Sequence, residues 1–195
     1  MIRRREFLAT SVAALSVPAI VQARHRNENP EAFEPEEVWL KAKLPPGELH
    51  VDPNTYRLYW TLPDRKAIRY SVGVGRLKLY EPGTFYVGRK AKWPNWRPTD
   101  AMIKREPHKY EQYADGVPGG PNNPLGARAL YLYYPGTKRD SYLRIHGTPH
   151  PWTIGHAVSN GCARLTNDHI AELYERVPVG TKVILHPRQF VDQTG

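Results

Sequence analysis

The sequence predicts a mostly β domain with one or two short helices. Residues 67–74 alternate between apolar and polar side chains, which is the period of a strand with one buried face. The chain also holds 12 Tyr, 5 Trp and 4 Phe, many of them in short runs, and aromatic residues favour strands. Its 19 prolines and 15 glycines indicate many turns between those strands.

A single domain is expected over residues 48–187. One helix is convincing: Thr166 or Asn167 caps it, apolar residues recur at helical spacing, and Pro178 with Gly180 ends it. Residues 92–127 are irregular and rich in proline, which is typical of a segment that shapes a binding site. The expected strands cover residues 49–51, 56–60, 67–74, 83–87, 129–134, 142–146 and 181–185.

The first 23 residues have the pattern of an export signal. Arg3, Arg4 and Arg5 precede a mostly apolar stretch over residues 7–21, and Val21-Gln22-Ala23 offers small residues to a signal peptidase. The stretch is too short and broken for a convincing membrane span. Arg4-Arg5-Glu6-Phe7-Leu8 also resembles a twin-arginine export motif. We therefore expect an exported protein of the periplasm or cell envelope with no stable membrane span after signal removal.

The ends of the mature chain are expected to lie outside the domain. Residues 24–47 are charged and contain several prolines, so they are interpreted as a linker or N-terminal arm. Residues 188–195 are interpreted as a C-terminal tail.

The net charge of +9 is consistent with an anionic partner. Residues 1–23 carry +2 of it, which leaves +7 on the rest of the chain. Nucleic acid, anionic lipid and an acidic cell-wall polymer all fit a basic surface, and solubility alone also explains it. The basic residues form no block of five or more, so we expect no nucleic-acid partner.

Cys162 is the only cysteine, and this makes it a candidate nucleophile. A lone thiol cannot form an internal disulfide and is open to oxidation in an oxidising compartment, so an exported chain that keeps one has a use for it. A buried cysteine that packs as a small hydrophobic residue is the alternative. Gly161 precedes the thiol and allows a tight turn and close approach of a substrate. The following helix N-terminus or Arg164 would favour the thiolate.

A cysteine nucleophile needs a base, and His146 is the best placed of the eight histidines. It ends an expected strand, and the loop between it and Cys162 is long enough to bring the chain back beside that strand end. No Asp or Glu lies between them, so a backbone carbonyl would have to orient the ring. His150, His156 and His169 compete for the same role.

These residues resemble the YkuD family of L,D-transpeptidases. The family signature is similar to His146-Gly147-Thr148, then Ile154-Gly155, then the run from Ser159 to Leu165. The segments that also resemble the family are Val72-Gly73-Val74-Gly75, Pro82-Gly83-Thr84-Phe85, Asn123-Pro124-Leu125-Gly126 and the run from Val177 to Val183.

The resemblance implies a β-sandwich-like L,D-transpeptidase catalytic fold that acts on peptidoglycan stem peptides. Cys162 would attack the carbonyl of an L-centre that precedes D-alanine, and the thioester would pass to an amine of a second stem. A wall-attached protein is another possible acceptor. By position, His146 is the base, the Gly147 carbonyl orients it, and the N–H groups of Gly161 and Cys162 form the oxyanion hole. Support or substrate contact would fall to Thr148, Ser159, Asn160 and Arg164. No cofactor and no metal are implied.

One departure and three alternatives accompany this resemblance. The family often has His where this chain has Asn160, and Asn cannot titrate. Water instead of an amine would make the protein a carboxypeptidase or amidase. A zinc hydrolase built on Cys162 and nearby histidines fits no defined ligand spacing. A domain without activity that binds peptidoglycan through its basic surface and aromatic loop is the third.

Overall fold

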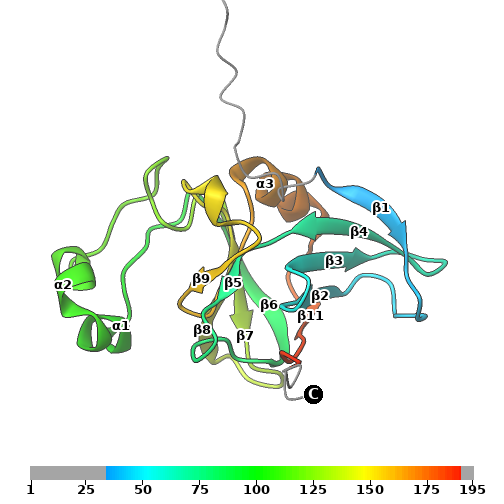
Figure 1. Cartoon of the computed structure of the whole chain (residues 1–195), viewed down its shortest axis with the longest axis horizontal. Coiled ribbons are helices and arrows are strands. Elements are labelled where there is room, and N and C mark those ends of the chain that lie inside the picture. The colour runs from blue at the N-terminus through cyan, green and yellow to red at the C-terminus, as the bar shows by residue number, and fades with distance from the viewer. Residues whose placement is uncertain (1–33, 190–195) are drawn as a thin grey trace, which may run out of the picture.

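The computed structural model describes residues 34–189, and they form a mostly β domain as predicted (Figure 1). One bent sheet has the strand order β1-β4-β3-β2-β11-β6-β7-β8-β10, and β5 and β9 pair in a small parallel sheet. The strands are β1 (Glu36–Trp39), β2 (Leu49–Asp52), β3 (Arg57–Thr61), β4 (Lys66–Ser71), β5 (Val74–Gly75), β6 (Gly83–Lys92), β7 (Arg128–Tyr133), β8 (Asp140–His146), β9 (Ala157–Ser159), β10 (Ala163–Arg164) and β11 (Lys182–Leu185).

Each strand expected from the sequence has a counterpart in this sheet. The expected strand over residues 67–74 is divided, because Gly73 leaves the β4 direction and bridges to Arg164 beside the cysteine loop. Tyr70, Val72 and Val74 share the buried face that the alternating pattern predicted. A side chain on Gly73 would collide with the Thr153 carbonyl, so this crossing needs a glycine.

Residues 92–127 are more ordered than expected. They contain α1 (Asp100–Arg105), α2 (Pro107–Tyr110) and the 3-10 turn η1 (Glu111–Tyr113). With α3 (Asn167–Arg176), this makes three α-helices among residues 34–189, one more than predicted. Helix α1 buries none of its side chains and α2 buries only Tyr110, so neither has the apolar periodicity that marks a helix in sequence.

Helix α3 begins and ends where the sequence indicated. The Thr166 hydroxyl accepts a hydrogen bond from the His169 N–H, and the helix ends before Val177. Its buried face, which includes Ile170 and Leu173, packs into the same core as the sheet (Figure 1). A second 3-10 turn, η2 (Pro151–Thr153), lies in the loop after β8.

Part of the expected N-terminal linker belongs to the sheet. Strand β1 pairs antiparallel with β4, with Glu37 opposite Ile68, and Lys66 forms an ion pair with Glu37. The prediction of a loosely held segment is therefore wrong for residues 36–39. The signal missed was the apolar pair Val38-Trp39, which is too short to show a period among the charges.

The two ends of the described chain are both attached to the domain. Arg188 donates to the Gly75 carbonyl, and the Gln189 N–H donates to the Asn54 side chain, so the expected tail starts as an ordered segment. The expected export signal lies outside the described residues, as do residues 190–195. Within residues 34–189, no helix has both the length and the apolar character needed to cross a bilayer.

Replacing Leu173 with alanine tests the packing of α3 on the sheet. Leu173 is fully buried in the core, so Leu173→Ala should lower the free energy of unfolding by about 2–5 kcal/mol. Glu175→Ala, an exposed change on the same helix, should stay within about 0.5 kcal/mol of the parent. Urea unfolding followed by circular dichroism measures both. Equal stability of the two variants would contradict this packing.

Candidate active site

His146 ends β8 in the interior of the domain. Ala129 of β7 lies opposite it on one side and Arg164 of β10 on the other. Its carbonyl accepts the Leu165 N–H at 2.8 Å, and only 4% of the residue is exposed. The position of the imidazole is therefore set by two neighbouring strands and not by a loop.

Backbone hydrogen bonds at Gly147 and Leu125 hold this ring, and both raise its pKa against the larger effect of burial. His146 Nδ1 lies 2.5 Å from the Gly147 carbonyl oxygen. A carbonyl oxygen only accepts, so Nδ1 carries the hydrogen in the neutral ring and Nε2 keeps its lone pair. This arrangement gives the ring the form of a general base, and the Gly147 carbonyl holds it as the family resemblance implied.

The Gly147 carbonyl is held by close backbone packing. A side chain on Gly147 would lie 2.4 Å from Asn167 Oδ1, and one on Gly126 would lie 2.5 Å from the Gly147 carbonyl carbon. Asn167 Oδ1 also accepts the Ala127 N–H at 2.9 Å. The sequence segment ending at Gly126 thus packs directly behind the group that orients His146.

Cys162 lies in the turn between β9 and β10, beside β8. The register pairs Ala163 with Ile145 and Arg164 with His146, so Cys162 falls opposite Arg144. Residues two apart on a strand point to the same face, so the side chains at 144, 146, 162 and 164 gather on one face. The thiol sulfur lies 4.0 Å from the Tyr142 carbonyl, and the residue as a whole is partly exposed.

Gly161 gives the cysteine turn its shape. Its φ of 124° is one that L side chains rarely adopt, and an added side chain would lie 2.9 Å from the Leu79 carbonyl. Gly75 of β5 packs against it, since a side chain there would lie 2.7 Å from the Gly161 Cα. The thiol is therefore presented by a turn that requires glycine on both sides of the contact.

Ser159 braces the same turn and alters the expected oxyanion hole. Its hydroxyl donates to the Cys162 carbonyl at 2.7 Å and accepts the Gly161 N–H at 3.2 Å. The Gly161 N–H is thus engaged within the turn, contrary to the expectation that it points toward a substrate. Only the Cys162 N–H remains of the two expected donors.

Burial favours the neutral forms of both reactive groups. It lowers the pKa of His146 to about 3, helped by the positive charges of Arg164 and Arg144. It also raises the pKa of the Cys162 thiol, against the opposing charges of Arg144 and Arg164. Both groups therefore favour their neutral forms, while the charge of Arg164 lowers the pKa of the thiol and so favours the thiolate, as the sequence suggested.

Arg144 is a charged residue of this site that the sequence did not reveal. Asp140 holds its guanidinium with contacts of 2.6 and 2.8 Å. Arg144 lies two residues before His146 on the same strand, so the two side chains point to the same face. The sequence could have indicated this only if the strand had already been assigned.

The remaining predicted residues support the site in different ways. Thr148 is buried and accepts the His150 N–H at 3.1 Å. Arg164 is held through its backbone by Gly73, while its Nε has no hydrogen-bond partner among residues 34–189. Asn160 accepts from Arg76 at 2.9 Å and Arg105 at 2.7 Å, and donates to the Tyr110 hydroxyl at 2.7 Å.

The competing histidines lie outside this cluster. His150 is exposed and its ring lies 4.8 Å from that of Trp152, while His156 is exposed in the following loop. His169 is buried in α3 and contacts the Glu34 carboxylate at 3.3 Å. In the part of the chain that the structure describes, no three His, Cys, Asp or Glu side chains are grouped to hold a metal ion.

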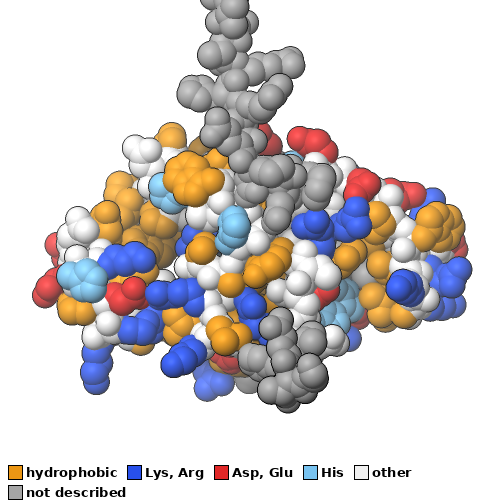
Figure 2. Space-filling model, viewed as in Figure 1, with side chains coloured by type: hydrophobic (Ala, Val, Ile, Leu, Met, Phe, Trp, Pro, Cys, Tyr) orange, Lys and Arg blue, Asp and Glu red, His pale blue; other side chains and the backbone are white. Residues whose placement is uncertain are grey.

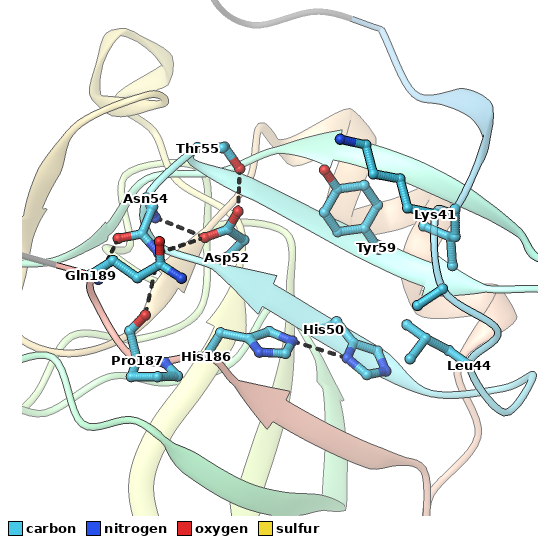
Figure 3. A pocket seen from close by; sticks show the side chains of 12 residues that line it. Lys41, Leu44, His50, Asp52, Asn54, Thr55, Tyr59, His186, Pro187 and Gln189 are labelled. Carbon is cyan, nitrogen blue, oxygen red and sulfur yellow. Dashed lines mark hydrogen bonds between the residues drawn. The ribbon is translucent and has the colours of Figure 1, made fainter. Parts of the chain in front are cut away.

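A pocket of about 500 Å³ opens elsewhere on the domain, between residues 40–44, the β2–β3 hairpin and the C-terminal segment (Figure 3). His50 and His186 face each other in it, with Nδ1 of the first 3.1 Å from Nε2 of the second. Asp52 is engaged by Asn54 and Thr55. Neither Cys162 nor His146 lines this pocket, so it is separate from the candidate active site.

The structure is a mostly β domain in which Cys162 and His146 lie on the same face of neighbouring strands. The L,D-transpeptidase catalytic domain family, YkuD, matches residues 46–185. The chain belongs to this family.

Curated relatives carry the same assignment. The chain is 36% identical over 140 residues to the probable L,D-transpeptidase ErfK/SrfK of Escherichia coli, covering 70% of this chain and 41% of that protein. It is 34% identical over 152 residues to the putative L,D-transpeptidase YqjB of Bacillus subtilis, covering 76% and 77%. The chain spans about two fifths of the length of the Escherichia coli relatives it matches.

Solved structures share the fold. A Brucella melitensis protein described as a probable carnitine operon oxidoreductase is 42% identical, with a TM-score of 0.54, covering 76% of this chain and 91% of that one. An L,D-transpeptidase from Mycobacterium smegmatis has a TM-score of 0.52 at 19% identity, covering 71% and 58%. At that identity the second likeness speaks for the fold alone.

Replacing Gly147 with alanine should displace the carbonyl that holds His146 while leaving the histidine itself unchanged. The new methyl group would collide with Asn167 and shift the carbonyl that orients His146, so Gly147→Ala should lower both the melting temperature and the reactivity of Cys162. Gly120→Ala is the matched control, because nothing lies within 4 Å of its added carbon. Thermal unfolding and the iodoacetamide reaction rate measure the two effects, and a Gly147→Ala protein that behaves like the control would rule out the packing described.

The pH dependence of thiol alkylation tests the neutral resting pair. Because the pKa of Cys162 is raised, its alkylation rate should stay low near neutral pH and rise with a midpoint above the ordinary value of about 8.5. Arg144→Gln removes a positive charge that favours the thiolate, so it should move the midpoint higher still, whereas Lys182→Gln, a similar change on β11, should not. A plateau of fast alkylation between about pH 4 and 7 would instead indicate a resting thiolate–imidazolium pair.

Proposed function

We propose that this protein is a peptidoglycan L,D-transpeptidase that acts through a thioester on Cys162. The observation that carries the proposal is the placement of Cys162 and His146 on one face of the β8–β10 pair, with the His146 ring held at Nδ1 by the Gly147 carbonyl. Membership of the L,D-transpeptidase catalytic domain family supports the choice of reaction.

The acylation step follows from the protonation of the pair. His146 Nε2 takes the proton of the Cys162 thiol as the sulfur attacks the carbonyl carbon of the L-centre that precedes D-alanine in a tetrapeptide stem. The Cys162 N–H stabilises the oxyanion that forms. When the tetrahedral intermediate collapses, the C–N bond breaks, and the leaving amine of D-alanine takes the proton from His146. A thioester remains on Cys162.

The second half reverses the roles of the same groups. An amine of a second stem attacks the thioester carbonyl, and His146 takes a proton from it. Collapse of the second intermediate breaks the C–S bond and returns the proton to sulfur, which leaves a 3→3 cross-link and the free thiol. An amine of a wall-attached protein or a water molecule would use the same sequence of steps, with attachment or hydrolysis as the outcome.

The surface and the leader support a place in the cell envelope. Lys and Arg side chains are spread over the face shown in Figure 2, where they suit an acidic cell-wall polymer better than one compact anionic ligand. The export pattern of residues 1–23 directs the protein to the periplasm or envelope. We propose that the mature protein meets its stem peptides there.

Mass spectrometry of a single reaction tests the chemistry. Purified protein incubated with a tetrapeptide stem should release D-alanine and gain the acyl mass on Cys162. Cys162→Ser should abolish the adduct, and His146→Gln should slow release by about 10²–10⁴-fold, as expected for loss of a general base. His150→Gln, an exposed histidine outside the site, is the control.

Adding an amine acceptor to the same assay identifies the second step. A cross-linked product that appears only with the amine supports transfer, whereas a tripeptide product without it supports hydrolysis. Turnover that persists in Cys162→Ser or His146→Gln would contradict the roles proposed for Cys162 and His146. Retention of inactive parent protein on purified sacculi would instead favour a binding domain without activity.

A further inference from the structure

Asn160 joins three segments that are far apart in the sequence. Its side-chain oxygen accepts from Arg76, which follows β5, and from Arg105, which ends α1. Its side-chain nitrogen donates to the hydroxyl of Tyr110, which ends α2. Both acceptor positions of the carboxamide oxygen are therefore used, and the side chain is fixed at three contacts.

The two helices that Asn160 contacts have few other attachments through apolar packing. We call residues 97–116 the flap. Helix α1 buries no side chain, and α2 buries only Tyr110, whose ring lies 6.4 Å from that of Trp96. Figure 1 shows both helices to one side of the sheets. Polar contacts therefore carry much of the stability of the flap against the domain.

A salt bridge extends the contact from the domain into the flap. Arg76 Nη2 lies 2.7 Å from the Glu106 carboxylate, which sits between α1 and α2, and Glu106 is also 3.7 Å from Arg105. The backbone N–H of Arg76 donates to the Ser159 carbonyl at 2.9 Å. Arg76 thus connects the flap to the residue that braces the cysteine turn.

The same turn carries the nucleophile. Ser159 and Asn160 precede Gly161, and the Ser159 hydroxyl holds the Cys162 carbonyl at 2.7 Å. Asn160 is therefore two residues from Cys162 along the backbone, and its neighbour Ser159 is hydrogen-bonded to Cys162. Gly161 packs closely against Gly75 and the Leu79 carbonyl, which restricts the movement that the turn can absorb.

The neutral charge of Asn160 also matters to the thiol. Two guanidinium groups share its oxygen, and Glu106 is the carboxylate that pairs with them. A carboxylate at position 160 would satisfy both guanidinium groups equally well, but it would place a negative charge two residues from Cys162 and disfavour the thiolate. Asparagine supplies the hydrogen bonds without that charge.

We propose that Asn160 is a positioning residue, a latch that holds the flap against the cysteine turn and so aligns Cys162 for attack. The inference rests on the proposed function, since the alignment concerns the acylation of Cys162. Opening of the flap and misalignment of the thiol are then coupled, because the same side chain connects both.

Two substitutions of Asn160 distinguish the effect of its hydrogen bonds from the effect of its neutral charge. Asn160→Ala removes the latch, so amide hydrogen exchange over residues 100–113 should accelerate about tenfold, and kcat for D-alanine release should fall by a similar factor with a smaller change in KM. Asn160→Asp keeps acceptors for both arginines and lets the Tyr110 hydroxyl donate, so flap exchange should stay slow. Its negative charge should instead move the alkylation midpoint of Cys162 to higher pH.

Variants of the flap test the same contact from the other side. Arg105→Ala should accelerate flap exchange and lower kcat in the same direction as Asn160→Ala, and it stands in if the latter fails to fold. Lys104→Ala removes a neighbouring cation of α1 and should leave both quantities unchanged. The latch is refuted if Asn160→Ala leaves flap exchange unchanged, if exchange accelerates while kcat and Cys162 alkylation stay at parent values, or if Lys104→Ala matches Arg105→Ala.

These measurements remain decisive if the proposed reaction is wrong. Hydrogen exchange and alkylation need no stem peptide, so a parent protein that releases no D-alanine would remove the proposed function while the latch is still tested through flap protection and thiol reactivity. Conversely, normal D-alanine release by Asn160→Ala would remove the latch and leave the function in place.

Discussion

The hydrogen bond from His146 Nδ1 to the Gly147 carbonyl is the interaction on which the candidate site depends. It leaves Nε2 unprotonated and fixes the plane of the ring, and it does so with a backbone group in place of the carboxylate of a catalytic triad. A carbonyl brings no charge into the interior, so the ring remains neutral where burial and two arginines already disfavour the imidazolium. Gly126 and Asn167 pack closely against Gly147 and restrict the position of that carbonyl.

The same burial sets the chemistry of the thiol. Desolvation raises the pKa of Cys162 and lowers that of His146, so both groups favour their neutral forms. A neutral thiol also reacts more slowly with oxidants than a thiolate does. Arg144 and Arg164 lower the cost of the developing thiolate without creating it in the resting state.

The candidate reacting residues of the site were easier to predict from the sequence than the residues that hold them in position. Cys162 and His146 follow from residue type, spacing and the glycine before the thiol, because these requirements are local. The Asn160 contacts could not be predicted, because Arg76, Arg105 and Tyr110 come from three segments 50 to 84 residues away in the sequence. Gly161 was expected to allow a tight turn, but the hydrogen bond of its N–H to Ser159 depends on the three-dimensional path of that turn.

From residue patterns alone come the mostly β architecture, the ends of α3 and the choice of candidate reacting side chains, since alternation, capping and reactivity are properties of short segments. Three-dimensional packing was needed to make β1 an edge strand, to order the flap, and to place Arg144 beside the thiol. Those features depend on long-range contacts whose energy is absent from any single segment: the pairing of β1 with β4, the latch at Asn160, and the parallel register of β8 with β10.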